Sequence, residues 1–132
     1  MHNGTYSLLR ACRVAKQGSL IIVELNDGAE VEPNDVGEIY KAARGFGVLP
    51  NPGVLIIAHM PVQFSASARE MAAQLCALGG VKGVAVCTDV TSVRVMVNFF
   101  VRINRPRTPV RVFSNQTEAE DWLNSLIIVS TN

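Results

Sequence analysis

The 132-residue sequence lacks the patterns that identify a metalloprotein, a redox enzyme or a secreted protein. Its three cysteines, Cys12, Cys76 and Cys87, form no Cys-x-x-Cys pair, and its two histidines share no metal-ligand spacing with a cysteine or a carboxylate. Residues 1–10 contain no apolar segment of the length that a secretory signal needs. We therefore expect no metal, no cofactor, and reduced, buried thiols in a cytoplasmic protein.

Catalytic and nucleic-acid-binding patterns are also scarce. No Gly-x-Gly-x-x-Gly or Gly-x-Ser-x-Gly is completed anywhere in the chain. The 12 Lys and Arg against 11 Asp and Glu give a net charge of +1, without the basic excess of a nucleic-acid-binding protein. The longest apolar runs, 20–23 and 54–58, are too short to span a membrane. These absences favour a protein that is not an enzyme, does not bind nucleic acid and does not span a membrane.

What the sequence does contain is enough apolar material for one packed domain. Hydrophobic residues make up 48% and charged residues 17%, which excludes disorder for most of the chain. A chain of this length can bury a core without help from a metal or a disulfide. We expect a single domain over 1–132, with its core at about 6–126 and an apolar tail, 127–132, that the pattern does not place.

Strand and helix patterns alternate along the chain. They predict an N-terminal antiparallel hairpin and then a mostly parallel sheet with helices between its strands. The expected strands are 7–16, 20–25, 54–58, 84–87 and 110–113, and the expected helices are about 33–44, 65–78, 91–103 and 116–126. The sequence therefore predicts an α/β fold with a mixed sheet of about five strands and about four helices.

The carboxyl ends of the parallel strands form a candidate ligand edge, because ligands of such sheets gather where the helices begin. The candidates there for a ligand contact or a phosphoacceptor are His59, Ser65, Ser67, Asp89 and Ser92. Each has a structural alternative: His59 can be a hydrogen-bonded imidazole, Ser65 or Ser67 can cap the helix that follows, and Asp89, Thr91 or Ser92 can cap the next one.

The helix expected at about 91–103 is apolar nearly all round. One face, expected in the core, is made by Val93, Met96, Val97, Phe100 and Val101. A second face carries Val95, Phe99 and Ile103, with Arg102 beside them. Such a helix is either deeply buried or part of a contact surface. We expect the second face to be an interface with a protein partner or with a second copy of the chain.

Charge is unevenly distributed along the chain. Residues 24–38 contain six acids and no Lys or Arg, and residues 94–111 contain five arginines and no acid. Two explanations remain open. The stretches can be two solvated surfaces, or the arginines can dock on an acidic or anionic partner.

Several strings resemble a known group of proteins. They are FSASARE at 64–70, NFFVRINRP at 98–106, PVRVF at 109–113 and EAEDWL at 118–123. Over about residues 6–126 the chain resembles small bacterial SpoIIAA-like proteins of the STAS-related class. The resemblance implies a mixed-sheet α/β fold and no catalysis. Related STAS domains act as anti-sigma antagonists or as parts of anion transporters, and the structurally similar CRAL-TRIO domains bind lipids.

The antagonists are switched by phosphorylation of a serine at the start of the second helix, with an Asp just before that serine. Here Phe64 precedes Ser65. Ser65 and Ser67 therefore match the phosphorylated serine by position only.

Three functions follow from these observations. The first is a non-enzymatic, cytoplasmic STAS-like domain with a binding or regulatory role, acting through protein contact as a homodimer. The second is a carrier of a small anionic molecule or a lipid, held at the apolar edge around Met60, Val62 and Phe64. The third is a hydrolase-like enzyme that pairs His59 with Ser65 or Ser67.

Overall fold

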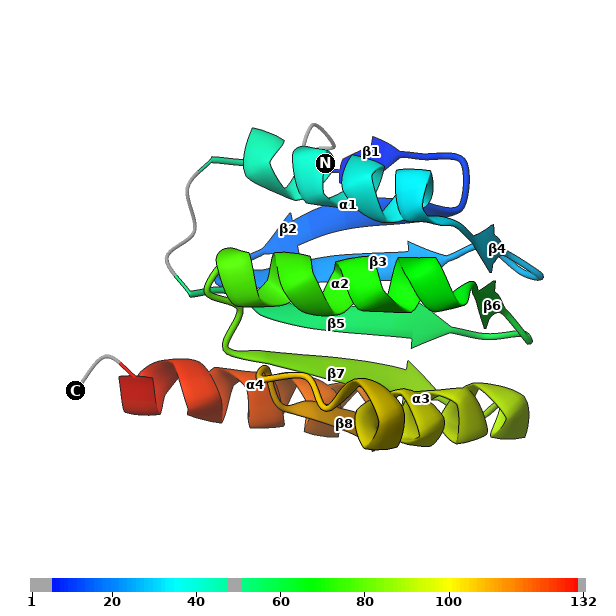
Figure 1. The fold of residues 1–132 in the computed structure, drawn as a ribbon. Helices are drawn as coiled ribbons and strands as arrows, with labels where there is room; N and C mark the ends of the chain where they lie inside the picture. Colours follow the sequence, from blue (N-terminus) through cyan, green and yellow to red (C-terminus); the bar gives the residue numbers. More distant parts are fainter. Residues whose placement is uncertain (1–5, 48–50, 131–132) are drawn as a thin grey trace.

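The main sheet has its strands in the order β1–β2–β3–β5–β7–β8 (Figure 1). The computed structural model describes residues 6–47 and 51–130. The strands are β1 (Tyr6–Leu8), β2 (Cys12–Gln17), β3 (Leu20–Leu25), β5 (Gly53–Ala58), β7 (Gly83–Thr88) and β8 (Val110–Phe113). Strand β2 is antiparallel to both of its neighbours, β1 and β3, and the strands β3, β5, β7 and β8 are parallel. The predicted mixed sheet is confirmed, with six strands in place of about five.

The extra strand arises because the single strand predicted at 7–16 is two strands. The chain reverses between them, and the Leu9 N–H donates to the Cys12 carbonyl at 2.8 Å. Asn26, just after β3, stabilises this turn with two hydrogen bonds. Its backbone N–H donates to the Ala11 carbonyl at 2.9 Å, and its side-chain amide donates to the Arg10 carbonyl at 3.0 Å. Alternation of apolar residues could not reveal this turn, because its partner lies 15 or more residues away.

Three helices cover one face of the sheet and one covers the other (Figure 1). The helices are α1 (Pro33–Gly45), α2 (Ala66–Leu78), α3 (Thr91–Asn104) and α4 (Gln116–Ser130). The strands β3, β5, β7 and β8 follow one another in one direction across the sheet. Because crossovers between parallel strands are right-handed, the three connecting helices fall on the same face. The last helix, α4, follows the final strand β8 and packs on the opposite face of the sheet.

The last helix is longer than the sequence predicted. Expected at 116–126, α4 runs to Ser130, and Ile127 packs on the apolar cluster that contains Leu123. The apolar tail, unplaced by its pattern, is thus largely a continuation of α4. The rest of the tail, 131–132, lies outside the described residues.

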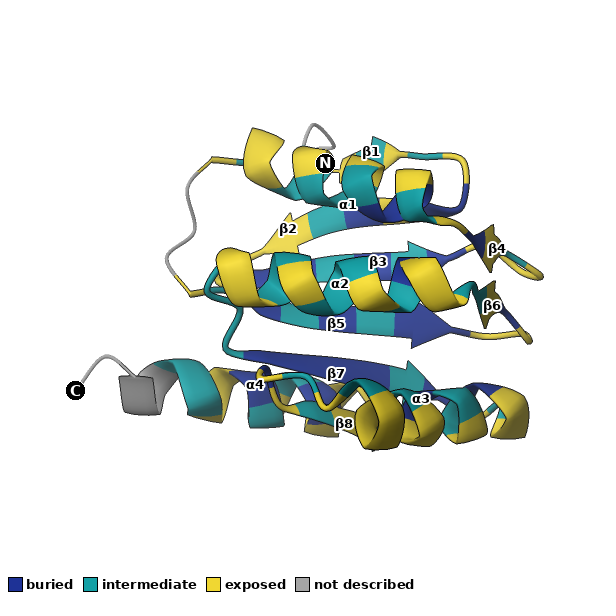
Figure 2. Cartoon of the chain, viewed as in Figure 1, coloured by how far each residue is buried: buried dark blue, intermediate teal, exposed yellow. Residues whose placement is uncertain are grey.

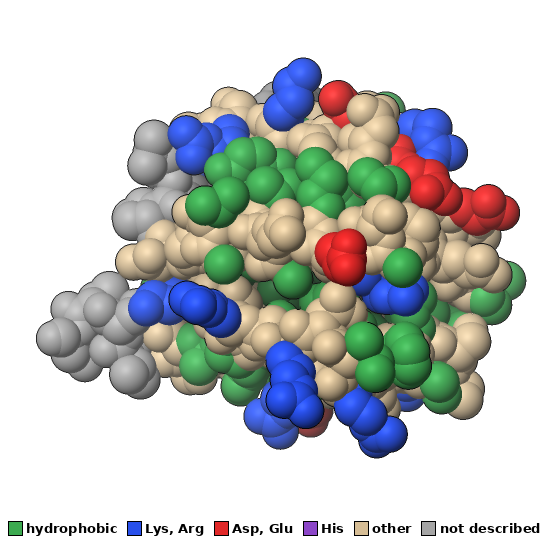
Figure 3. All heavy atoms as spheres, in the orientation of Figure 1, with side chains coloured by type: hydrophobic (Ala, Val, Ile, Leu, Met, Phe, Trp, Pro, Cys, Tyr) green, Lys and Arg blue, Asp and Glu red, His purple; other side chains and the backbone are tan. Residues whose placement is uncertain are grey.

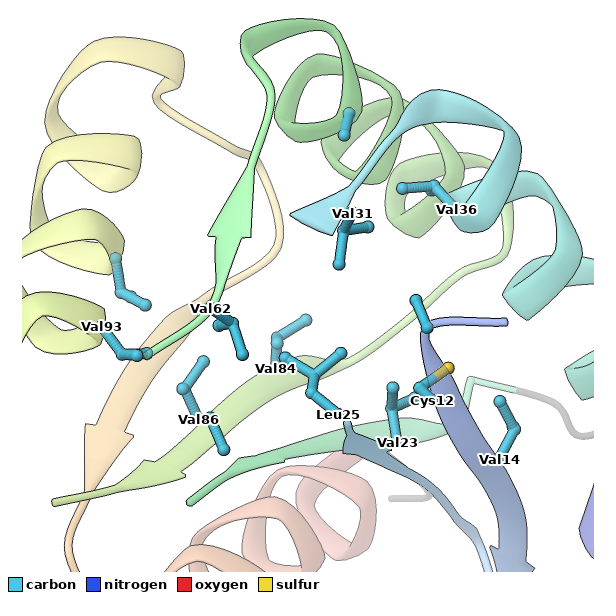
Figure 4. Close-up of a cluster of buried hydrophobic side chains, with 14 of the residues drawn as sticks. Cys12, Val14, Val23, Leu25, Val31, Val36, Val62, Val84, Val86 and Val93 are labelled. Atoms are coloured by element: carbon cyan, nitrogen blue, oxygen red, sulfur yellow. The ribbon is translucent and has the colours of Figure 1, made fainter. Parts of the chain in front are cut away.

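Each face of the sheet has its own apolar cluster. Figure 2 shows that the central strands β5 and β7 are mostly buried. The cluster beneath α4 contains Leu20, Leu55, Ile57, Ala85, Ala119 and Leu123. The larger cluster lies beneath the other three helices (Figure 4). At the carboxyl end of the sheet, Leu25, Val31 and Val62 point toward one another (Figure 4). They close this cluster where the short strands β4 (Glu30–Val31) and β6 (Gln63–Phe64) pair in parallel. Burial on both faces explains why the central strands are continuously apolar.

The sequence predicts no membrane-spanning segment, and the lengths of the helices can be compared with that prediction. Among the helices in the described part of the chain, none is long and apolar enough to cross a membrane.

Candidate functional site

The parallel strands end at one edge of the sheet, on the right in Figure 1, and α2 and α3 begin at that edge. The loops there carry the residues predicted to contact a ligand. The structure places them on that edge, where the side chains of His59 and Ser65 each have a hydrogen-bond partner. In the described residues, no hydrogen bond joins one of the five candidates to another.

His59 follows β5 and is part of a polar row across the sheet. Its Nε2 lies 3.1 Å from Oε2 of Glu24, and Oε1 of Glu24 accepts a 2.7 Å hydrogen bond from Arg13. The Arg13 guanidinium lies over the Tyr6 ring, 5.6 Å from its centroid. Burial raises the pKa of the Glu24 carboxyl, but the hydrogen bonds from His59 and Arg13 outweigh it and leave that pKa below its ordinary value. His59 is therefore hydrogen-bonded, as its structural alternative expects.

Ser65 is the N-cap of α2. Its Oγ accepts from the Ala68 N–H at 3.1 Å. The alternative cap, Ser67, is inside the first turn and exposed. No hydrogen bond joins His59 to either serine in the residues that the structure describes. The geometry thus gives no support to a Ser–His pair, and capping accounts for Ser65 by itself.

The start of α3 differs from the expected cap. None of the three candidates, Asp89, Thr91 or Ser92, caps the helix: the N-cap is Val90, without a side-chain hydrogen bond. The turn is held instead by buried Thr88, whose Oγ1 accepts from the Val90 N–H at 3.0 Å. The sequence predicts a cap from one of the polar side chains next to the helix. The hydrogen bond comes instead from Thr88, the last residue of β7.

The outer face of α3 is exposed, as the sequence predicted. Val95, Phe99 and Ile103 are 61%, 51% and 59% exposed, and Arg102 beside them is exposed too. We call these four residues the α3 stripe. The opposite side of the helix is anchored in the core. Val101, expected in the core, is 39% exposed, because it lies at the margin of the buried face beside the edge strand β8.

The acidic and basic stretches have different environments. Asp35 is buried and pairs with Arg10, whose Nε donates to Oδ1 at 2.9 Å. This bond lowers the pKa of Asp35 in spite of desolvation. Among the basic residues, Arg94 donates to the Ser114 hydroxyl and Arg111 lies over the Phe113 ring. In the described part of the chain, none of the five arginines of 94–111 forms an ion pair.

Two apolar cavities flank α2, and the sequence did not indicate either. One, of about 120 Å³, lies between α2 and α3, and the other, of about 190 Å³, lies between α1 and α2. Val62 and Phe64, from the predicted apolar edge, line the first, whereas Met60 is exposed on the surface. In the sequence, the small residues Ala72 and Ala73 of α2, which line these cavities, are a weak indication of them. The cavities themselves depend on the distance between packed helices, which a local pattern does not give.

Comparison with known proteins identifies the family and the fold. The chain belongs to the family described as "Domain of unknown function (DUF7793)", whose profile matches residues 18–127. In structure it is similar to an uncharacterized protein of the DUF3478 family from Shewanella loihica PV-4, which has a SpoIIAA-like fold. That crystal structure superposes with a TM-score of 0.59 at 14% identity, over 93% of this chain and 98% of the other. No curated protein matches the chain significantly in sequence. The fold is thus SpoIIAA-like, as the resemblance implied.

Proposed function

We propose that this domain is non-enzymatic and acts through protein contact made by the α3 stripe, with a second copy of the chain as the partner. The observation that supports the proposal is the exposure of three apolar side chains on one helix whose other side is fixed in the core. Exposed apolar groups that gather in this way mark contact sites. A regulatory role in the cytoplasm is part of the same proposal.

The spacing of the stripe suits packing of two helices about a twofold axis. Val95, Phe99 and Ile103 repeat every four residues and form one ridge along α3. In an antiparallel pair centred on Phe99, the two Phe99 rings meet, and Val95 of each copy faces Ile103 of the other. The two Arg102 residues are then about 9 Å apart along the axis, at a rise of 1.5 Å per residue. At that separation salt screens most of their repulsion.

The absence of a catalytic role rests on how the candidate groups are engaged. His59 is tied to Glu24 and Ser65 caps α2. Nucleophilic catalysis by a serine needs a base within hydrogen-bond reach, and the contacts described for these residues supply none. At the same edge, Ser65 stabilises the start of α2 and Thr88 stabilises the turn before α3.

The first test introduces a charge into the stripe. Val95→Asp leaves the fold intact, because Val95 is exposed, but buries a carboxylate against Ile103 of the partner. We expect the dissociation constant of the dimer to rise about 10- to 100-fold, measured by light scattering over a dilution series. Leu78→Asp is the matched control, since Leu78 is 78% exposed at the end of α2. An equal effect of both substitutions would contradict the assignment of the interface.

A second variant tests the antiparallel arrangement itself. In Val95→Asp/Ile103→Lys, each Asp of one copy faces a Lys of the other. We expect self-association to recover relative to Val95→Asp alone, because opposite charges now pair at both ends of the interface. A double variant that dissociates more readily than Val95→Asp would rule out this geometry.

A further inference from the structure

An open groove of about 600 Å³ lies between α3 and the strand β8. Arg94, Asn98 and Arg102 line it from α3, and residues 110–112 line it from β8. Its volume is within the range of roughly 300–1,000 Å³ that is usual for ligand sites. Figure 3 shows basic side chains at the lower margin of the view, where Figure 1 has α3 and β8. The groove therefore joins part of the basic stretch to the end of the sheet.

The strand in this groove has a free backbone edge. In the described part of the chain β8 pairs with β7 alone, and it ends the sheet. The Pro109 carbonyl accepts from the Val84 N–H of β7 at 2.9 Å, so it points into the sheet. Because successive residues of a strand direct their backbone groups to opposite sides, the N–H and C=O groups of Val110 and Val112 point away from β7. No hydrogen bond engages them within residues 6–47 and 51–130, and such an edge is a template for an added strand.

Positive charge accompanies this edge along its length. Arg102 is exposed, and Arg94 is half-buried with its guanidinium on the hydroxyl of Ser114, just after β8. Since α3 runs back along the sheet before β8 begins, Arg102 is near the start of that strand and Arg94 is near its end. On the other face, the guanidinium of Arg111 lies over the Phe113 ring, 5.2 Å from its centroid. Unpaired charges of one sign beside a docking edge select a partner of the opposite sign.

The chemistry of the groove favours a peptide over other occupants. Two copies of the chain joined edge to edge through β8 would bring their arginines together, and like charges on paired strands are unfavourable. Single-stranded nucleic acid is bound by basic grooves with aromatic side chains on which its bases stack, and none of the lining residues is aromatic. The apolar part of the lining suits aliphatic side chains instead, since it consists of Val97, Val101, Val110 and Val112.

We propose that an extended acidic segment of another protein pairs with β8 as a further strand of the sheet, with its carboxylates beside Arg94 and Arg102. The groove shares Arg102 with the α3 stripe, but Val95, Phe99 and Ile103 do not line it. Both of its sides belong to one chain, so the inference does not depend on self-association.

The test uses a short labelled peptide of alternating glutamate and valine as the probe, titrated with the parent chain and followed by fluorescence anisotropy. We expect binding that weakens as salt is added. At saturation the amides of Val110 and Val112 should exchange their hydrogens more slowly, because the added strand engages them. A peptide with lysine in place of each glutamate should bind at least about 10-fold more weakly. Failure of the glutamate peptide to bind, binding that leaves both amides unprotected, or tighter binding of a single-stranded oligothymidylate would overturn the proposal.

Three variants locate the site on the chain. Arg94→Gln should weaken the glutamate peptide about 3- to 10-fold, because one charge beside the added strand is lost. Ser114→Ala removes the hydrogen bond between Arg94 and Ser114 but keeps the charge, and it should bind the peptide as the parent chain does. Arg44→Gln is the matched control, since Arg44 is an exposed arginine of α1, and it too should leave the affinity unchanged. Equal affinities of Arg94→Gln and Arg44→Gln would refute the placement of the peptide beside α3.

Discussion

Arg10 is exposed, yet it holds the buried carboxylate of Asp35, 25 residues along the chain. Asp35 also accepts from the Glu32 backbone N–H at 2.9 Å, so one carboxylate fixes the start of α1 and ties it to the turn after β1. No local pattern marks this pair. Asp35 lies in the acidic stretch 24–38, and its partner Arg10 lies outside that stretch.

The Arg10–Asp35 pair predicts how acid affects stability. The folded-state pKa of Asp35 is lowered, chiefly by the hydrogen bond from Arg10. Its contribution is therefore complete above the ordinary Asp pKa of about 4 and is lost as pH falls through the lowered value. Asp35→Asn should reduce thermal stability at pH 7, and the difference from the parent should shrink below about pH 4. Melting temperatures across pH 2–7 measure this. Glu38→Gln, in an exposed pair with Lys41, should show little effect, and a constant difference at every pH would count against the assignment.

The cysteines make a second prediction for single residues. They are free thiols, as the sequence predicted, but of the three only Cys12 is buried as expected, whereas Cys76 and Cys87 are partly exposed. Burial raises the pKa of both Cys12 and Cys76 to about 11, and only the thiolate reacts with alkylating agents. At pH 8 both should react with iodoacetamide far more slowly than in the unfolded chain, and faster as pH approaches 11. Peptide mass analysis gives each rate, and rates equal to those of the unfolded chain would show that these thiols are not buried.

At the scale of elements, α4 packs closely on the sheet at Gly83 of β7. A Cβ at Gly83 of β7 would lie 2.6 Å from Cδ1 of Leu126 and 3.3 Å from the Trp122 ring. Gly83→Ala should therefore push α4 from the sheet and destabilise the fold by about 1–3 kcal/mol. Gly45→Ala is the control. Nothing lies within 4 Å of its Cβ position, and Gly45 is in α1, where Ala is favoured by up to about 1 kcal/mol. Denaturant unfolding compares the two, and equal stability of both variants would contradict the packing of α4.

The elements also show what local patterns can and cannot predict. The bounds of β3 and β8 were predicted residue for residue, because each is a mainly apolar segment, interrupted only by Glu24 or Arg111, between turn residues. The strand expected at 7–16 was wrong, because its turn is held by Asn26 from another strand. For α3 the helix was predicted correctly and its cap was not, since no side chain caps it and Thr88 of β7 stabilises the turn before it.

At the scale of the whole molecule, the α/β class and the SpoIIAA-like fold could be predicted from the sequence. After the N-terminal antiparallel strands, helices alternate with the strands of the main sheet, and right-handed crossovers then leave few arrangements of the sheet. The exposed face of α3 could be predicted too, since a helix that is apolar nearly all round can bury only one side in so small a chain. The cavity between α2 and α3 could not, because it depends on the distance between two packed helices.

The central claim is that the α3 stripe joins two copies of the chain, and the mass of the native protein tests it most directly. We expect native mass spectrometry of gently purified protein to show a species of twice the 14.3 kDa chain mass, which Val95→Asp converts to monomer. Extra mass that is lost on denaturation would be a bound molecule and does not bear on the α3 stripe. A monomer at every concentration tested, in the parent chain as in the variant, would contradict the account.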